Sequence, residues 1–337
     1  MSLARTIEFL CRSLCIIFGV MVLLLAVDSG GSKCEALCVD EAGKILGQAH
    51  RDFRNASDER FIGGLGRSES LVSDTIRAAL PPILECSELH VCGPLPNQLE
   101  PDLCEVQNIS HHIVVEKDGP LALVGTDSGI VVLAGTGAFA YGRRRDGNEI
   151  LFDGIGPLYG DYGSGFQIGL AGIRAAGRST WNARYETALT VPILDACRVQ
   201  SGMGDDFSMM DYMADIRDRS EIAALARIVD RVADEGDPSA LEIIRRAAAD
   251  MAETVRCVVE YLDVANDALP LIGTGSVVTN SRLYWTELDK QVRSFAPKLK
   301  PTLPKVPAVF GLCLALADRV GVNSPEFRSN LLANSPS

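Results

Sequence analysis

The chain has 337 residues, a formal net charge of −12 and a pI near 4.9. This length is enough to bury two domain cores. The acidic balance argues against a nucleic-acid partner, because no basic stripe is present to neutralise phosphates. The one basic cluster, Arg143-Arg144-Arg145, precedes Asp146-Gly147-Asn148. We interpret it as a solvent-exposed hairpin turn rather than a clamp for an anionic ligand.

The N-terminus carries an apolar run over Leu14–Val27 that superficially resembles a secretory signal. The run is too short to span a membrane comfortably. Its last residues also form the strand that leads into Asp28, and a strand buried on both faces is typically a continuous apolar run. We therefore predict a first strand over Val20–Val27, an extension over residues 1–20 with Met21 as a suitable start, and a cytoplasmic protein that does not bind membranes.

Further along, strand and helix patterns alternate up to about Gly125, which predicts a mixed sheet with crossover helices. A hairpin after Gly129 opens a second lobe, in which helical spacing dominates. We predict lobes over residues 21–127 and 128–325 and a tail over 326–337. The predicted elements are Ala36–Val39, Ser70–Leu80, His90–Gly93, Ile113–Val115, Ile130–Ala134, Ala138–Gly142, Gly169–Ala176, Ser220–Glu235, Pro238–Leu262 and Phe310–Val320.

Ten cysteines are scattered along the chain, which is too long to need disulfide bonds for stability. Many of them lie in apolar strand-like or helical runs, so we expect reduced, buried thiols: Cys34, Cys38, Cys257 and Cys313. Closely spaced cysteine pairs have no accompanying histidine cluster, which disfavours a zinc site.

Two glycine-rich segments each follow an apolar strand. The first is Asp28-Ser29-Gly30-Gly31-Ser32-Lys33 and the second is Gly135-Thr136-Gly137. Glycines at this density let backbone amides approach a charged ligand closely. Either turn alone is also typical of a simple hairpin, but the pair indicates a nucleotide held between two lobes. An acid at a strand end, such as Asp28, commonly holds hydrated Mg²⁺.

Five segments together resemble a known family. In chain order they are AVDSGGSK, VVEKDGPLAL, GIVVLAGTGAFAYG, GPLYGDYGSGFQIG and LIGTGSVVTNSRL, and they cover roughly residues 20 to 320. This order is similar to that of the acetate and sugar kinase, Hsp70 and actin superfamily, and within it to the BadF/BadG/BcrA/BcrD-type ATPases, the branch that contains N-acetylglucosamine kinase. The resemblance implies an α/β, two-lobed, ribonuclease H-like fold with ATP and Mg²⁺ in the cleft between the lobes.

The resemblance also assigns roles on the nucleotide side. It implies that Asp28 holds Mg²⁺ through water, whereas Lys33 either adds charge at the phosphates or only solvates its turn. Gly273 and Gly311 would let backbone and helix approach the nucleoside. The phosphate-binding residues would be Gly30, Gly31, Ser32, Gly135, Thr136 and Gly137, and the nucleoside would lie against Gly275 and Ser276.

Asp118 matches the acid that acts as general base in the resembling kinases. The alternative for Asp118 is a helix N-cap. Asp127, nine residues later, fits a turn before Gly129 and is the weaker candidate. Phosphoryl transfer needs such a base, together with alignment of the acceptor and neutralisation of charge.

Gly154 and Asp161 match positions that contact the sugar in the resembling family, although Asp161 could instead cap a helix that starts near Ser164. Asn55 or Asp58 would supply a further sugar contact. The chain departs from the family pattern in the segment Cys92-Gly93-Pro94-Leu95-Pro96, where a Ser-Gly pair is usual, and in Tyr162, which replaces an acid. These departures affect the identity of the sugar more than they affect ATP binding.

The resemblance therefore implies an ATP-dependent kinase of N-acetylglucosamine or a related amino sugar. The alternatives are an ATPase with another acceptor or an activator role, and a non-catalytic sugar or nucleotide sensor. The absence of cysteine between Cys104 and Cys197 disfavours an iron–sulfur activator, and the retained Asp28 and Asp118 disfavour a sensor. A homodimer is left open.

Overall fold

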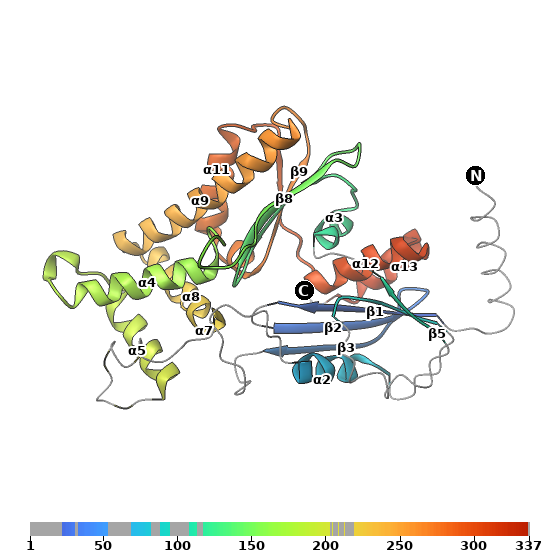
Figure 1. Cartoon of the computed structure of the whole chain (residues 1–337), viewed down its shortest axis with the longest axis horizontal. Helices are drawn as coiled ribbons and strands as arrows, with labels where there is room; N and C mark the ends of the chain where they lie inside the picture. Colours follow the sequence, from blue (N-terminus) through green and yellow to red (C-terminus); the bar gives the residue numbers. More distant parts are fainter. Residues whose placement is uncertain are drawn as a thin grey trace, which may run out of the picture.

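The computed structural model describes residues 22–30, 33–52, 69–81, 88–94, 108–112, 117–202, 204, 208, 212 and 219–335. These residues form two five-stranded sheets with helices packed around them (Figure 1). The strand order is β3-β2-β1-β4-β5 in the first sheet and β10-β9-β6-β7-β8 in the second. Both orders describe the same topology, three antiparallel strands followed by two parallel ones, so the two lobes repeat one plan.

The first sheet is built around β1 (Val22–Ser29), which pairs antiparallel with β2 (Lys33–Asp40) and parallel with β4 (Glu88–Cys92). The outer strands are β3 (Ile45–Asp52) beside β2 and β5 (Asn108–His112) beside β4. Strand β1 is apolar from Val22 to Val27, as expected for a strand whose two faces are both covered. The predicted first strand is thus confirmed from Val22 onward, while residues 20 and 21 lie outside the described residues.

Helix α2 (Glu69–Ala79) covers one face of this sheet, and α12 (Ala308–Val320) and α13 (Pro325–Ala333) cover the other. Residues 308–335 therefore return to the first lobe, although sequence order predicts them in the second lobe and in a tail. The physical reason is that α12 is apolar almost all round, so it must be buried on more than one side. Phe327 and Leu331 of α13 are fully buried in the same core.

Helix α12 also packs against α3 (Asp118–Val124), which precedes the second sheet. The two helices cross at glycines: a Cβ on Gly311 would lie 2.5 Å from the carbonyl oxygen of Gly119. Gly311 was predicted to let a helix approach the nucleoside. In the structure its missing side chain permits the close contact with α3, and the approach to a nucleoside stays a prediction.

The second sheet contains β6 (Gly129–Ala134), β7 (Ala138–Arg143) and β8 (Glu149–Asp153) as an antiparallel series, which confirms the predicted hairpin. The parallel strands β9 (Pro270–Thr274) and β10 (Lys300–Thr302) complete it. The largest core cluster lies between this sheet and its helices. These helices are α4 (Gly165–Ser179), η3 (Ala183–Tyr185), α5 (Thr190–Ser201), α7 (Arg219–Ala224), α8 (Ala226–Asp234), α9 (Pro238–Leu262), α10 (Ser276–Asn280) and α11 (Arg282–Arg293).

Helix α9 has the predicted bounds, and its N-terminus shows why. Asp237 accepts a hydrogen bond from the Ala240 N–H at 2.9 Å, and Pro238 occupies the first turn. Asp237 also accepts from Thr187 Oγ1 and the Ala188 N–H, both at 2.9 Å, and so fixes the loop before α5. The predicted single helix over Ser220–Glu235 is divided at Leu225 into α7 and α8.

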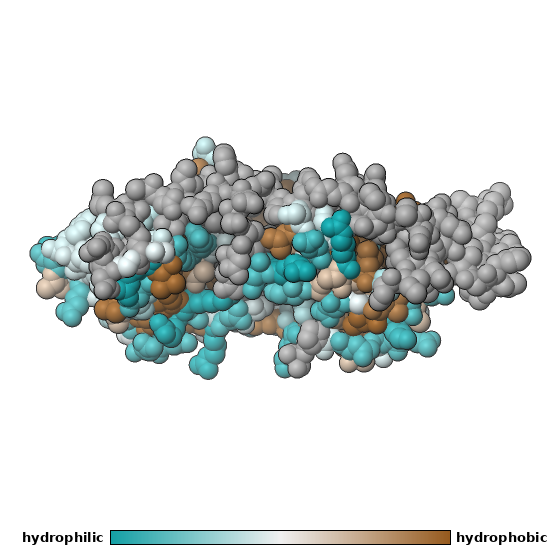
Figure 2. All heavy atoms as spheres, turned by 90° about the horizontal axis from the view of Figure 1, so that it is seen from below, coloured by the Kyte–Doolittle hydropathy of each residue, from teal (hydrophilic) through white to brown (hydrophobic). Residues whose placement is uncertain are grey.

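The described cysteines are free thiols, and all but Cys257 are buried. Within the residues that the structure describes, no helix combines the length and the apolar character needed to cross a membrane. On the face shown in Figure 2, hydrophilic residues cover much of the described surface and apolar residues occur in separate patches. Scattered apolar patches of this kind are ordinary on a protein surface.

Candidate active site

The second glycine turn, Gly135–Gly137, joins β6 to β7. It is closed by a hydrogen bond from the Gly135 N–H to the Gly137 carbonyl at 2.9 Å. The Gly135 carbonyl accepts from the Gly165 N–H at 2.7 Å, which ties the turn to the first residue of α4. The turn is therefore held by backbone groups, as a binding loop with a fixed shape requires.

The predicted nucleoside-side residues lie next to this turn. Strands β6 and β9 are parallel and in register at Leu133 and Thr274, so both end at the same edge of the sheet. A Cβ on Gly275, which has a φ of +87°, would lie 2.5 Å from the Ala134 carbonyl oxygen. A side chain at this position is excluded both by the left-handed backbone and by the close approach. Ser276 then starts α10.

An acidic loop follows β8 and approaches the same turn. Asp153 and Asp161 both have positive φ, 71° and 56°, which is strained for residues other than glycine. The Asp153 carboxylate accepts hydrogen bonds from the N–H groups of Gly154 at 2.8 Å, Asp161 at 2.6 Å and Tyr162 at 2.8 Å. One carboxylate thus folds the loop back on itself and sets the direction of the Asp161 side chain.

Asp161 is buried, with 2% of the residue exposed, and forms an ion pair with Arg219 at 2.7 Å. Burial raises the pKa of Asp161, and the positive charge of Arg219 opposes that increase. A Cβ on Gly137 would come within 3.0 Å of Asp161 Oδ2, so the glycine turn and the acid are in close contact. Ser164, not Asp161, caps α4 by accepting from the Gln167 N–H. The alternative role of Asp161 as a helix cap is wrong.

The apolar residues within this acidic loop are largely exposed. They are Ile155, Leu158, Tyr159 and Tyr162. Predicted sugar contact Gly154 lies at the start of the loop, with a φ of +75°. The other two predicted sugar contacts, Asn55 and Asp58, lie outside the described residues.

The first glycine segment is described in part, because Gly31 and Ser32 lie outside the described residues. Its ends are joined by a hydrogen bond from the Gly30 N–H to the Lys33 carbonyl at 3.0 Å. Lys33 Nζ pairs with Glu35 at 2.7 Å. Glu35 is the cross-strand partner of Asp28, so the two acids are neighbours on β2 and β1.

Cys92 also lies near Asp28. Burial raises the pKa of the Cys92 thiol to about 12, and the charge of Asp28 adds to the increase. Gly93 follows with a φ of +94°, and a Cβ there would lie 2.0 Å from the Val27 carbonyl oxygen. The departure from the usual Ser-Gly pair thus leaves an inert thiol and an obligatory glycine beside the end of β1.

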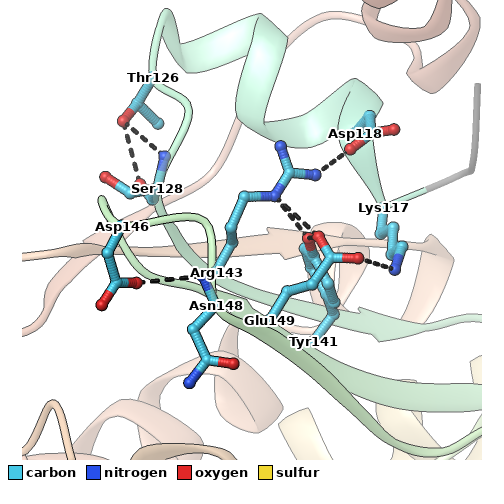
Figure 3. A network of polar contacts seen from close by, with 9 residues as sticks. All are labelled: Lys117, Asp118, Thr126, Ser128, Tyr141, Arg143, Asp146, Asn148 and Glu149. Atoms are coloured by element: carbon cyan, nitrogen blue, oxygen red, sulfur yellow. Dashed lines mark hydrogen bonds and ion pairs between the residues drawn. The ribbon is translucent and has the colours of Figure 1, made fainter. Parts of the chain in front are cut away.

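Asp118 belongs to a polar network around the end of the β7–β8 hairpin (Figure 3). Its carboxylate pairs with Arg143, and Arg143 Nε donates to Glu149 at 3.1 Å. Glu149 also accepts from Tyr141 Oη and from Lys117 Nζ, and these bonds help to lower the pKa of Glu149 to about 2, with the tyrosine bond as the largest cause. Lys117 holds the N-cap position of α3 and Asp118 is the first helical residue, so Asp118 is not a helix cap.

This network corrects the prediction for Arg143 and bears on the position of Asp118 relative to the second glycine turn. Arg143 is not a solvated turn residue, because its side chain is paired and only 23% exposed. Arg143 is also at the end of β7 remote from Gly137: the six residues of Ala138–Arg143 span roughly 17 Å at the usual strand rise. Asp118 is thus paired with a side chain from the end of β7 that lies away from the second glycine turn.

Sequence reasoning missed Arg219, Asp153 and Glu149. The available signal for Arg219 was that a buried acid such as Asp161 needs a cation nearby. That cation is 58 positions away along the chain, and only the fold identifies it.

Two sheets of one repeated topology, with glycine turns at the strand ends, define a two-lobed α/β fold of the actin, Hsp70 and sugar kinase type. Residues 25–311 match the sequence profile of the BadF/BadG/BcrA/BcrD ATPase family, and the chain belongs to this family. Membership of an ATPase family implies the use of ATP. The predicted fold and family are confirmed.

The chain is similar to an N-acetylmuramic acid/N-acetylglucosamine kinase of Clostridium acetobutylicum, with 27% identity over 86% of this chain and 97% of the relative. It is 27% identical to an N-acetyl-D-glucosamine kinase of Dictyostelium discoideum, over 82% of this chain and 91% of the relative. Among solved structures, a provisionally assigned N-acetylglucosamine kinase from Chromobacterium violaceum aligns with a TM-score of 0.62 and 22% identity, over 88% of this chain and 99% of that one. A ROK family glucokinase from Streptomyces griseus, solved with glucose and AMPPNP, aligns with a TM-score of 0.54 and 16% identity, over 88% of this chain and 99% of that one. At these identities the structural matches support the fold.

Proposed function

We propose that the protein is an ATP-dependent kinase that transfers a phosphoryl group to N-acetylglucosamine or a related amino sugar such as N-acetylmuramic acid. The observation that carries the proposal is the meeting of Gly135–Gly137 and Gly275–Ser276 at one edge of the second sheet. The names of the two curated relatives support the substrate class.

Phosphoryl transfer asks little covalent chemistry of the protein and depends on positioning and charge neutralisation. In this proposal the second glycine turn presents backbone amides to the phosphates, with Thr136 between the two glycines. Gly30, Gly31, Ser32 and Lys33 approach from the first lobe, and Gly275 and Ser276 lie against the nucleoside. Lys33 reaches the phosphates only if it leaves Glu35, with which it is paired here.

Asp28 is the residue proposed to hold Mg²⁺ through water. Asp28 fits a hard cation because it supplies carboxylate oxygens one residue before the end of β1, whereas its cross-strand neighbour Glu35 is paired with Lys33 and His50. When bound, Mg²⁺ neutralises charge on the phosphoryl groups. Asp28 would orient the hydrated ion beside the glycine segment.

Asp118 is proposed to accept the proton of the sugar hydroxyl. It follows β5, which runs parallel to β1 and leaves the sheet at the same edge as Asp28. Its carboxylate is engaged by Arg143 in the structure. The role as a base therefore requires this ion pair to open when the substrates bind.

On the sugar side, Gly154 and the exposed apolar residues of the acidic loop are proposed to contact the substrate, and Asn55 and Asp58 remain predictions. Free thiols and the use of ATP fit a cytoplasmic location. The strongly acidic composition supports a small-molecule substrate rather than nucleic acid.

The test is a coupled assay of ADP release with purified protein, ATP and a panel of sugars that includes N-acetylglucosamine, N-acetylmuramic acid, glucosamine and glucose. We expect sugar-dependent ADP release with at least one N-acetylated amino sugar, abolished when Mg²⁺ is removed with EDTA and restored by added Mg²⁺. Asp28→Ala should raise the Mg²⁺ requirement without weakening sugar binding. ADP release that does not depend on any sugar would contradict the kinase proposal.

A further inference from the structure

Arg219 lies beside the second glycine turn, although it comes from a different part of the chain. Its Nη2 would be 3.4 Å from a Cβ placed on Gly137 and is 2.7 Å from Asp161 Oδ2. The guanidinium therefore borders the turn that is proposed to receive phosphate. No residue of the turn itself carries a positive charge.

The pairing of Arg219 is incomplete. Its Nε is buried, and the described part of the protein offers it no hydrogen-bond partner. An arginine presents five N–H donors in a fixed fork, so one contact with Asp161 leaves donors for a second acceptor. The Arg219 side chain is 25% exposed, whereas that of Asp161 is 3% exposed. Of the two partners, Arg219 is the one that a ligand can reach.

Asp161 has the features of a residue that positions another. Its backbone is strained at a φ of 56° and is fixed by the Asp153 carboxylate through its own N–H. The N–H groups of Ala138 and Gly156 stabilise its carboxylate in addition to Arg219. A buried carboxylate with these partners holds the guanidinium in place, and strain of this kind is typical of sites where geometry is functional.

We propose that Arg219, positioned by Asp161, binds an oxyanion of the ligand seated at the Gly135–Gly137 turn. An arginine fork matches the oxygens of phosphate and carboxylate equally well. Within the proposed kinase function, the oxyanion is supplied either by the terminal phosphoryl group of ATP or by the carboxylate of N-acetylmuramic acid. In both cases Arg219 acts on the ligand directly, and Asp161 acts through Arg219.

The experiment compares Arg219→Gln with the unmodified protein and with Arg227→Gln, a matched change at an exposed arginine of α8. Dissociation constants are measured for AMPPNP and ADP with Mg²⁺, and KM and kcat for N-acetylmuramic acid and N-acetylglucosamine, with Tm as a check on folding. If Arg219 binds the terminal phosphoryl group, Arg219→Gln weakens AMPPNP about tenfold or more and leaves ADP within twofold. If it binds the sugar carboxylate, the KM for N-acetylmuramic acid rises by the same order while that for N-acetylglucosamine is unchanged.

Arg219→Lys keeps the charge but loses the fork, and it should recover part of the affinity that Arg219→Gln loses. This variant keeps the test valid if Arg219→Gln does not fold. The proposal would be overturned if both variants kept the ratio of the dissociation constants for AMPPNP and ADP and the ratio of the KM values for N-acetylmuramic acid and N-acetylglucosamine. Arg219 and Asp161 would then form a structural ion pair only, whether or not Tm falls. If Arg219→Gln weakens the binding of AMPPNP but not of ADP in a protein that phosphorylates no sugar, the result would support the proposed role of Arg219 and reject the sugar kinase function.

Discussion

At the scale of single residues, variants of Asp118 and Arg143 distinguish a catalytic role of Asp118 from a purely structural one. Asp118→Asn and Arg143→Gln both break this ion pair, and Arg143→Gln also removes the bonds to Glu149 and Tyr141, so Arg143→Gln should lower Tm at least as much as Asp118→Asn. If Asp118 is the base, Asp118→Asn alone lowers kcat, by about 10² to 10⁴-fold, with little change in ATP binding. Steady-state kinetics and thermal unfolding of the two purified variants make the comparison. Equal, small effects on kcat in both would remove Asp118 from the chemistry.

The residues that sequence could predict are those whose role is local. Gly135, Gly137 and Gly275 were predicted because a glycine turn directly after an apolar strand is visible in a few adjacent residues. The ion pairs were not, because Asp161 and Arg219 are 58 positions apart and Asp118 and Arg143 are 25 apart. Such pairs depend on the folded arrangement of strands and helices, which composition and periodicity do not specify.

At the scale of elements, the N-terminus of α9 gives a stability prediction. Asp237→Ala removes the helix cap and the contacts to Thr187 and Ala188, and should cost about 1–2 kcal/mol. Glu242→Ala, an exposed change on the same helix, serves as the control and should be nearly neutral. Urea unfolding at pH 7 measures both. A loss below that of the control would show that the cap does not hold the helix.

The Asp237 cap should also make stability depend on pH. Burial alone would raise the pKa of Asp237, but hydrogen bonds from Ala188, Ala240 and Thr187 outweigh it and hold the pKa below its ordinary value. A lowered folded pKa means that the stabilisation is complete above the unfolded value near 3.9 and is lost as pH falls through the folded pKa. The difference in unfolding midpoint between Asp237→Ala and the unmodified protein should therefore shrink below about pH 4.

Elements were predicted well where their ends carry local markers. The Gly236-Asp237-Pro238 sequence fixed the start of α9, and the apolar run fixed β1. The break between α7 and α8 at Leu225 has no glycine or proline to mark it, so it was not predicted. The destination of α12 was also missed, because an apolar helix reveals that it is buried but not against which sheet.

At the scale of the whole molecule, the first lobe should depend on the C-terminal helix. Phe327→Ala empties a fully buried position and should cost about 3–5 kcal/mol, mainly in the first lobe. Both tryptophans, Trp181 and Trp285, lie in the second lobe. Far-UV circular dichroism should therefore begin to change at lower urea than tryptophan fluorescence in this variant.

Glu326→Ala, an exposed change beside Phe327, is the control and should leave the two transitions as they are in the unmodified protein. Coincident, unshifted transitions for Phe327→Ala would mean that α13 does not stabilise the first lobe, as the predicted tail over residues 326–337 implied. A separated pair of transitions would instead identify the first lobe as the less stable unit.

The return of α12 and α13 to the first sheet has a consequence for the order in which the protein matures on the ribosome. Strands β1 and β2 emerge before the second sheet, but the helices that cover one of their faces follow that sheet in the chain. At about 5–20 residues per second the uncovered strands wait on the order of tens of seconds. The second sheet, whose strands all lie between Gly129 and Thr302, can assemble during that interval. The lobe whose strands are translated before the second sheet is thus completed after it, and its open apolar face is where a chaperone would be needed.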